Sequence, residues 1–225
     1  MAPRPVIEYY FSFISLWSYI GSRRLLALAR EHNAKVIYKP IDLMHIFSIS
    51  GGLPVKLRAS QRQAYRLLEM ERWTKIRNLP TVKHPKFYPA DPTLAHRVLL
   101  AAIEELGYDD PAVQEFARRG TETVWANEGD IADHDTIVEV ANVSGLQGSC
   151  LLERAKNESK FQEQADSYTK EAEDKRFFGA PLYLYRDEPF WGQDRLEMLD
   201  DVIKSGREAL PLPTKGILNA QGSFI

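Results

Sequence analysis

Two serines, Ser15 and Ser18, stand where an apolar run gives way to a helix-like stretch. The apolar run extends from Val6 to Phe13 and the helix-like stretch from Tyr19 to Arg30. A turn from a strand into a helix places side chains over the helix N-terminus, where unpaired N–H groups and the helix dipole favour negative charge. A serine hydroxyl there can donate a hydrogen bond to a thiolate that a ligand delivers. It can equally be an ordinary N-cap, because serine is a frequent capping residue.

The segment Gly192-Gln193-Asp194-Arg195 precedes the last helix-like stretch and has groups that suit the zwitterionic end of an amino acid. The backbone N–H groups of Gln193 and Asp194 would hold a carboxylate, and the Asp194 side chain would hold an ammonium group. The alternative is a structural one, in which Asp194 is an N-cap and Arg195 forms a surface ion pair.

Composition limits the classes of partner. The chain has 225 residues, 44% of them hydrophobic and 27% charged, and a net charge of −2, so it lacks the basic excess that nucleic-acid binding requires. Its one cysteine, Cys150, excludes an internal disulfide, a dithiol centre and a Cys-x-x-Cys metal site, and we interpret it as a small helix residue. We predict no metal site. No apolar run reaches the ~20 residues of a membrane span. We therefore expect no membrane partner and a cytoplasmic location, with a mitochondrion or another organelle left open.

The elements that must position these residues are predicted from the spacing of apolar residues and from the residues that end helices and form turns. Strand-like runs at Val6–Phe13 and Ala34–Leu43 flank one helix, which predicts a βαβ unit with parallel, neighbouring strands. A hairpin is predicted from Pro181 to Trp191, and a closing helix from about Asp194 to Ser205 with Gly206 as its stop.

Between the βαβ unit and the hairpin, from Val55 to Arg176, only helix signals are found. Asp91-Pro92 and Asp110-Pro111 each combine a capping acid with a proline suited to the first helical position. The polar stretch from Glu153 to Arg176 is typical of one long solvated helix.

This order of elements predicts an α/β fold of the thioredoxin-like, DsbA-like type, with a sheet interrupted by a large all-helical insertion. The thioredoxin-like domain would be discontinuous and consist of residues 4–55 and 177–207. Residues 56–176 would form the helical insertion, and residues 208–225 a mobile C-terminal tail. In such a fold Pro181 would follow a cis peptide bond and face the Ser15 turn, although most X–Pro bonds are trans.

Three motifs resemble those of kappa-class glutathione transferases and of the related 2-hydroxychromene-2-carboxylate isomerases. They are Phe13-Ile14-Ser15-Leu16-Trp17-Ser18-Tyr19, Gly179-Ala180-Pro181 and Gly192-Gln193-Asp194-Arg195. The resemblance extends from Val6 to about Ile203 and implies the same DsbA-like fold, glutathione as cofactor and a homodimer.

The resemblance also implies roles for individual residues. Ser15 would hydrogen-bond the glutathione thiol, Ala180 beside Pro181 would pair with the cysteinyl backbone, and Gln193 and Asp194 would bind the γ-glutamyl group. Arg62 is the nearest match to a lysine that touches the glycyl end. Gly52 lies in the loop that contacts glutathione in the family, where the family has asparagine. The chain departs from the family pattern at Ser12, Leu16 and Leu53 as well.

The resemblance leaves three functions open. We favour a glutathione-dependent isomerase of an aromatic α-keto acid, because the stretch Tyr65–Trp73 is more similar to that branch. The first alternative is a kappa-class transferase that conjugates electrophiles, and the second is a DsbA-like binding protein without catalysis. In either enzyme the partner is a small aromatic or electrophilic molecule, and Trp17 and His45 are the candidate substrate contacts.

Overall fold

The computed structural model describes residues 3–213, which fold around a four-stranded mixed sheet with the strand order β2-β1-β3-β4. The strands are β1 (Val6–Phe11), β2 (Lys35–Pro40), β3 (Leu182–Tyr185) and β4 (Glu188–Trp191). β1 pairs with β2 in parallel and with β3 antiparallel, and β3 pairs with β4 antiparallel. The predicted βαβ unit and the predicted hairpin are thereby confirmed.

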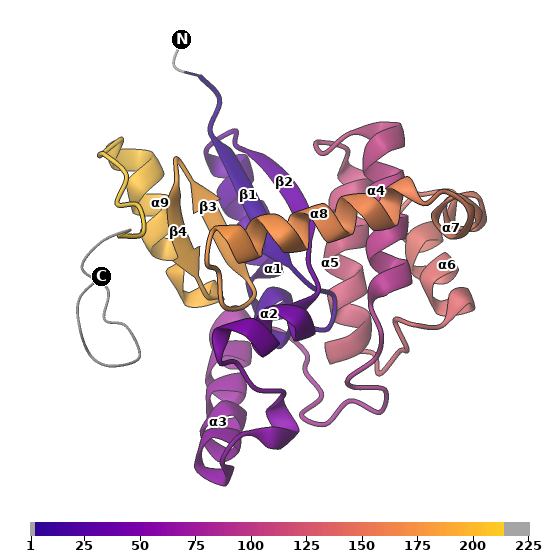
Figure 1. Cartoon of the computed structure of the whole chain (residues 1–225), viewed down its shortest axis with the longest axis horizontal. Coiled ribbons are helices and arrows are strands. Elements are labelled where there is room, and N and C mark those ends of the chain that lie inside the picture. The colour runs from indigo at the N-terminus through magenta and orange to yellow at the C-terminus, as the bar shows by residue number, and fades with distance from the viewer. Residues whose placement is uncertain (1–2, 214–225) are drawn as a thin grey trace.

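Helices cover both faces of the sheet (Figure 1). They are α1 (Leu16–Glu31), α2 (Leu43–Ser50), α3 (Ser60–Arg77), α4 (Thr93–Leu106), α5 (Pro111–Trp125), α6 (His134–Val143), α7 (Gly148–Asn157), α8 (Lys160–Asp174) and α9 (Leu196–Ser205), with 3-10 turns η1 (Val55–Leu57) and η2 (Gln193–Arg195). Residues 55–176 contain helices and no strand, as predicted.

The strands alternate their side chains between two core clusters. Tyr9 and Phe11 pack in the cluster that includes α1, α5 and α9, whereas Tyr10, Leu182 and Leu184 pack in a smaller cluster with α2 and α8. Because both faces are covered, most strand residues are buried, and β3 is buried throughout.

The second strand is shorter than expected, because its predicted end begins a helix that the sequence analysis missed. Asp42 is the N-cap of α2 and accepts hydrogen bonds from the backbone N–H groups of Met44 and His45. Gly51 ends the same helix with a left-handed φ of 78°. This short helix lies beside α8 over the sheet (Figure 1).

The predicted long helix at Glu153–Arg176 is in fact two helices, α7 and α8, separated at an extended Glu158. An uninterrupted helix turns about 100° per residue, so the buried faces around Ala155 and Phe161 would lie roughly 120° apart on it. The break lets both faces reach the core. The helix start at Asp110-Pro111 is confirmed, whereas α4 begins one residue later than expected, at Thr93.

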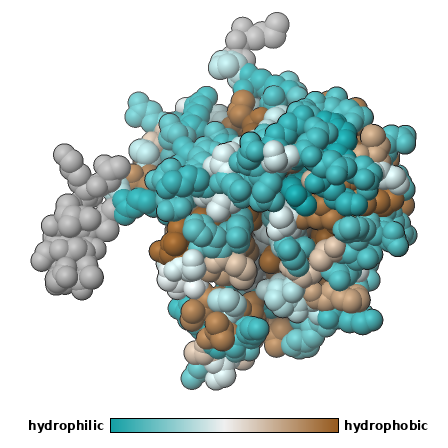
Figure 2. Space-filling model, turned by 45° about the vertical axis from the view of Figure 1, so that its right-hand side comes forward, coloured by the Kyte–Doolittle hydropathy of each residue, from teal (hydrophilic) through white to brown (hydrophobic). Residues whose placement is uncertain are grey.

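α8, the last helix of the insertion, crosses the sheet and is anchored to it by charge. Lys39 of β2 contacts Glu171 of α8 at 2.6 Å and Glu8 of β1 at 2.8 Å. The outward side of α8 is mostly exposed and polar, and the upper part of the face seen in Figure 2 is correspondingly hydrophilic. The insertion is therefore packed on the sheet through its last helix.

The domain limits at 4–55, 56–176 and 177–207 stay predictions. Of the predicted tail, residues 214–225 lie outside the described residues, while the backbone N–H of Leu210 donates to Glu188 of β4 at 3.0 Å. No described helix combines the length and the apolar character that crossing a membrane requires.

Candidate active site

The Ser15 turn joins β1 directly to α1. The backbone N–H of Ser15 donates to the Ser12 carbonyl at 3.0 Å, which closes the turn. Ser15 is the N-cap of α1: its hydroxyl oxygen accepts from the Ser18 N–H at 3.2 Å. The same hydroxyl donates to the Ala180 carbonyl at 3.2 Å, so it bridges two segments far apart in the sequence.

Ser18 occupies a different environment from Ser15. Its side chain is fully buried, and its hydroxyl has no hydrogen-bond partner among the described residues. Of the two serines, only Ser15 has a side chain that hydrogen-bonds the segment that precedes β3.

The peptide bond between Ala180 and Pro181 is cis, which confirms the prediction. The Ala180 carbonyl on one side of this bond accepts from the Ser15 hydroxyl, and the Pro181 carbonyl accepts from the Gly192 N–H at 2.9 Å. The Ser15 turn, the cis-proline and the start of η2 are thus linked in a continuous network of hydrogen bonds.

Gln193 and Asp194 lie in η2, directly after a glycine with an unusual backbone. Gly192 has a φ of 101°, and a Cβ atom there would come within 2.5 Å of an Asp194 carboxylate oxygen. The Gln193 side chain is buried, and its Oε1 accepts from the Nε and Nη2 of Arg77, both at 3.3 Å. Asp194 stays partly exposed and pairs with Arg195 at 3.0 Å.

Three adjoining cavities lie along α3. The Gln193 cavity, of about 260 Å³, is lined by Trp17, Glu69, Trp73, Ala180, Trp191, Gly192, Gln193, Asp194 and Arg195. The Arg62 cavity, of about 460 Å³, is lined by Trp17, Arg58, Gln61, Arg62, Tyr65, Arg66 and Glu69. The Tyr88 cavity, of about 290 Å³, is lined by Met44, Pro54, Val55, Lys56, Gln63, Arg66, Leu67, Lys83, His84, Pro85, Tyr88, Pro89 and Trp125.

Shared walls connect these cavities. Trp17 and Glu69 belong to both the Gln193 cavity and the Arg62 cavity, and Arg66 belongs to both the Arg62 cavity and the Tyr88 cavity. The structure thus brings Trp17, Ala180, Gln193 and Asp194 to one cavity. Ser15 lies behind Ala180, buried to 4% exposure.

Two predicted contacts lie elsewhere. The His45 Nε2 is 3.4 Å from a Glu173 carboxylate oxygen of α8, and His45 lines none of the three cavities along α3. α2, which the sequence analysis missed, turns this side chain toward α8, so the expected position of His45 in the cleft is corrected. Gly52 also lines none of these cavities and lies against the Phe47 ring.

Two supporting residues were missed by the sequence analysis. His96 of α4 is buried behind the Ser15 turn, with Nε2 3.4 Å from both the Ser12 hydroxyl and the Phe13 backbone N–H. Burial lowers the pKa of His96 to about 4, against the opposing effect of Asp42 and Asp91, so the ring is neutral near pH 7. Arg77, the other residue, orients Gln193.

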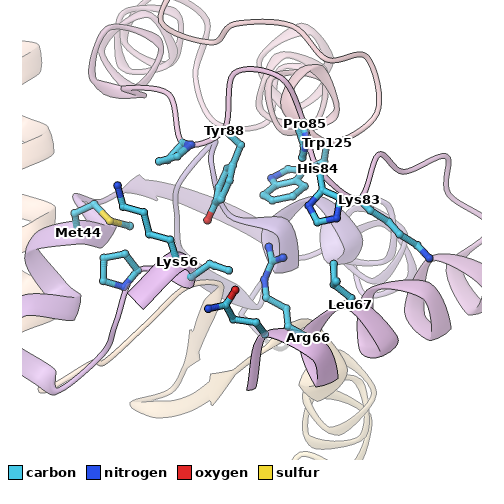
Figure 3. Close-up of a pocket in the computed structure, with 13 residues that line it drawn as sticks. Met44, Lys56, Arg66, Leu67, Lys83, His84, Pro85, Tyr88 and Trp125 are labelled. Atoms are coloured by element: carbon cyan, nitrogen blue, oxygen red, sulfur yellow. The ribbon is translucent and has the colours of Figure 1, made fainter. Parts of the chain in front are cut away.

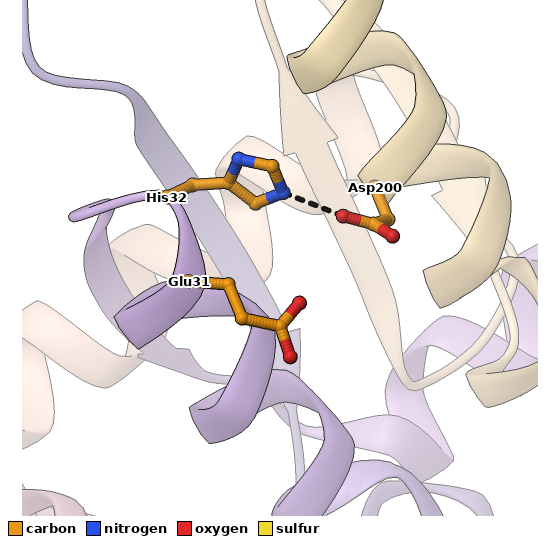
Figure 4. A group of neighbouring side chains, drawn as sticks. All are labelled: Glu31, His32 and Asp200. Carbon is orange, nitrogen blue, oxygen red and sulfur yellow. Dashed lines mark hydrogen bonds and ion pairs between the residues drawn. The ribbon is translucent and has the colours of Figure 1, made fainter.

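A further group of titratable side chains lies on the far side of α1, where Glu31, His32 and Asp200 place ligand-type atoms within 4.8 Å of one another (Figure 4). The His32 Nε2 contacts Asp200 at 2.5 Å. Arg24 pairs with both carboxylates, and Lys204 pairs with Asp200. These cations already neutralise the group, and we describe it as an ion-pair network that joins α1 to α9.

A mixed sheet, a helix that begins directly after the first strand and a cis-proline facing that helix define the thioredoxin-like class of proteins, here with serines instead of a cysteine pair. The chain belongs to the DSBA-like thioredoxin domain family, whose model matches residues 6–204.

Named relatives give further comparisons. The chain is 26% identical to the 2-hydroxychromene-2-carboxylate isomerase of Sphingobium xenophagum, over 88% of this chain and 97% of that one. It is 25% identical to glutathione S-transferase kappa 1 of Caenorhabditis elegans, over 96% of each. Among solved structures, a 2-hydroxychromene-2-carboxylate isomerase superposes with a TM-score of 0.72 at 23% identity, over 89% of this chain and 95% of that one. At this identity the superposition supports the fold alone.

Proposed function

We propose that this protein is a glutathione-dependent isomerase of an aromatic α-keto acid. The observation that carries the proposal is the Ser15 hydroxyl, held at the N-terminus of α1 and against the carbonyl before the cis-proline. The relatives that are named isomerases or a transferase also support it, because they align with nearly the whole chain.

The residues present fit glutathione. Gly192 leaves free the space that a Cβ would fill beside Asp194, and the partly exposed Asp194 carboxylate can receive an ammonium group. In this proposal Ala180 pairs with the cysteinyl backbone, Gln193 and Asp194 hold the γ-glutamyl end, and Arg62 in the adjoining cavity holds the glycyl carboxylate. The proposed site does not use Gly52 or His45.

Bound glutathione would supply a thiol that adds reversibly to a conjugated double bond and so permits rotation about that bond. The protein's own part is electrostatic. The Ser15 hydroxyl turns from the Ala180 carbonyl toward the sulfur, and the unpaired N–H groups at the start of α1 favour negative charge there. Both effects lower the thiol pKa and raise the thiolate fraction at neutral pH. Trp17 lines both the Gln193 cavity and the Arg62 cavity and stays a candidate contact of the substrate.

The first test compares Ser15→Ala with Ser18→Ala by titrating the ultraviolet thiolate absorbance of stoichiometric glutathione. We expect a thiolate below neutral pH with the wild type and Ser18→Ala, and its loss with Ser15→Ala. A lost donor of this kind lowers kcat/KM about 10²-fold. Ser15→Ala also costs about 1 kcal/mol as a lost cap, which a melting curve would separate from the chemistry. No perturbed thiolate in the wild type would contradict the proposal and leave Ser15 as a helix cap.

The second test separates isomerase from transferase. 2-Hydroxychromene-2-carboxylate should turn over faster with enzyme and glutathione than with glutathione alone, with no glutathione consumed. Steady conjugation of a chlorinated aromatic would favour the transferase instead, and binding of peptides without any dependence on thiol would favour the non-catalytic alternative. A homodimer and a cytoplasmic location stay predictions.

A further inference from the structure

The Tyr88 cavity has walls of one charge sign. It lies between α3, the α2–α3 connection and the segment before α4 (Figure 3). Its lining residues include three cations, Lys56, Arg66 and Lys83, and no carboxylate. The rest of the lining is mostly apolar or aromatic. A small cavity of this kind suits a ligand that combines an apolar body with a negative charge.

Arg66 has no ionic partner among residues 3–213. Its guanidinium lies 5.3 Å from the centroid of the Trp125 ring, and burial lowers its pKa with no nearby carboxylate to oppose this. Lys83 on the same cavity differs, because it pairs with Glu71 at 3.0 Å. A half-buried cation without a partner is costly, and an anion at the guanidinium would offset that cost.

Tyr88 provides a second donor aimed at the same space. Its ring packs against that of Trp125 with the centroids 4.7 Å apart, and burial raises its pKa, so its hydroxyl stays protonated. Figure 3 shows the Tyr88 hydroxyl turned into the cavity, on the side where Arg66 and Lys56 lie. No residue of the described chain hydrogen-bonds this hydroxyl. A forked guanidinium and a phenol are donors that a carboxylate accepts well.

The cavity is also connected to the Ser15 turn. The Trp125 side chain is buried, and its Nε1 donates to the Ile14 carbonyl at 3.3 Å, one residue before Ser15. Through Arg66 the cavity adjoins the Arg62 cavity, and through Trp17 that cavity adjoins the one at Gln193. A ligand in the Tyr88 cavity would therefore lie at the far end of the groove that ends at Ala180.

We propose that the Tyr88 cavity binds a small aromatic carboxylate, with Arg66 and the Tyr88 hydroxyl holding the carboxylate and Trp125 and Leu67 packing against the ring. This deepens the proposed function and in that respect rests on it, because it assigns the acid group of the aromatic substrate to named residues. The same pair would exclude neutral aromatic compounds of equal shape.

The test uses 1-naphthoate and its neutral isostere 1-naphthamide, titrated calorimetrically without glutathione. We expect the wild type to bind naphthoate at least about tenfold more tightly than the amide. Arg66→Met should weaken naphthoate about tenfold or more and change amide binding little. Tyr88→Phe should weaken naphthoate roughly threefold to tenfold. Lys83→Met is the matched control: it removes a charge from the same cavity, but one already paired, and should change binding less than about threefold.

Equal affinities for the two probes would overturn the inference. A loss of naphthoate affinity with Lys83→Met as large as with Arg66→Met would also overturn it, since the ligand would then respond to the total positive charge of the cavity and not to Arg66. If Arg66→Met does not fold, Arg66→Lys replaces it in the test, because lysine keeps the charge but lacks the forked pair of donors of the guanidinium. An unchanged naphthoate affinity of Arg66→Lys would contradict the assigned geometry. Naphthoate binding through Arg66 without glutathione-dependent turnover would refute only the proposed function. Turnover with an unchanged KM in the Arg66 variants would refute only this inference.

Discussion

The polar residues around the Ser15 turn differ in how many hydrogen bonds their side chains form. Ser15 both donates and accepts, whereas the neighbouring Ser18 hydroxyl is buried without a partner. His96 holds the turn from behind through its neutral ring. Ser15 and His96 each act through two hydrogen-bond contacts, so changes at this scale should affect the site and its pH dependence without altering the fold.

His96 predicts an acid sensitivity of folding. Its pKa of about 4 in the folded protein lies below the unfolded value of about 6.5, so as the pH falls the unfolded chain takes up the proton first. The stabilisation is present above pH 6.5 and is lost as the pH falls toward 4. Between pH 7 and pH 5 this group should remove about 2 kcal/mol of the free energy of unfolding.

Urea unfolding at both pH values would measure the effect of this histidine. His96→Asn, which keeps an acceptor near the Phe13 N–H, should flatten the pH dependence by that amount. Equal pH slopes for the variant and the wild type would show that His96 does not titrate in this range.

The packing of α1 against η2 and α9 depends on a close approach at Gly21. A Cβ at this position would lie 2.8 Å from both the Gln193 Cβ and the Tyr183 hydroxyl. α1 also joins α9 through Arg24 and His32, both of which contact Asp200. Gln193 is therefore positioned by an interface between helices as well as by its own loop.

Gly21→Ala tests this interface. Alanine favours a helix by about 1 kcal/mol over glycine, but the overlap with two buried groups should cost more, giving a net destabilisation of about 1–2 kcal/mol. Because Gln193 would be displaced, KM for glutathione should rise more than kcat falls.

Tyr183→Phe is the companion variant, since the Tyr183 hydroxyl is buried without a partner in the described structure. By itself it should be neutral or stabilising, and combined with Gly21→Ala it should restore part of the stability. Thermal unfolding measures both effects. A Gly21→Ala protein more stable than the wild type would contradict the close approach.

In the whole molecule the insertion packs on the sheet through α8, and Lys39 lies at that contact. Burial opposes the Lys39 charge, but hydrogen bonds to Glu171 and Glu8 outweigh it and raise its pKa. Burial opposes the charge of Glu8 as well, but hydrogen bonds from Lys39 and Tyr10 outweigh it and lower the Glu8 pKa. α8 is thus joined to two strands through one cation.

Lys39→Met should destabilise the protein by about 2 kcal/mol, because two partly buried carboxylates lose the cation that bridges them, and the remaining pair of Glu171 with Lys175, at 3.9 Å, is longer. Lys170→Met on the exposed side of α8, which removes a surface pair with Asp174, should change the stability far less. Urea unfolding at pH 7 would compare them. Equal effects would mean that the Lys39 junction contributes no more than a surface ion pair.

The fold was largely predictable, because its signals are local. The strand–helix turn, the capping acids and the hairpin turn at Arg186-Asp187, where both residues have positive φ, are encoded in short segments. The cis Ala180-Pro181 bond followed from the order of elements. α2 was missed because its cap, Asp42, lies two residues after the end of β2, and the apolar residues after it continue the strand pattern.

The candidate site was predictable only in part, for a tertiary reason. Ser15, Ala180, Gln193 and Asp194 lie at turns that the topology brings together. His96, Arg77 and Arg66 lie on helices of the insertion, and the residues they contact, such as Phe13, Gln193 and Trp125, are dozens of positions away in the sequence. Nothing local distinguishes an arginine that faces a cavity from one on a solvated surface.

The hydrogen bond between Ser15 and Ala180 spans 165 positions of the chain. During synthesis β1 can pair with β2 early, but its other edge must wait for β3. Until then the nascent chain presents an unpaired edge of a tyrosine- and phenylalanine-rich strand, a surface that invites pairing with other chains. This protein should therefore be most prone to aggregation after the insertion has been synthesised and before β3 leaves the ribosome, and truncation after the insertion should be more harmful than truncation after α9.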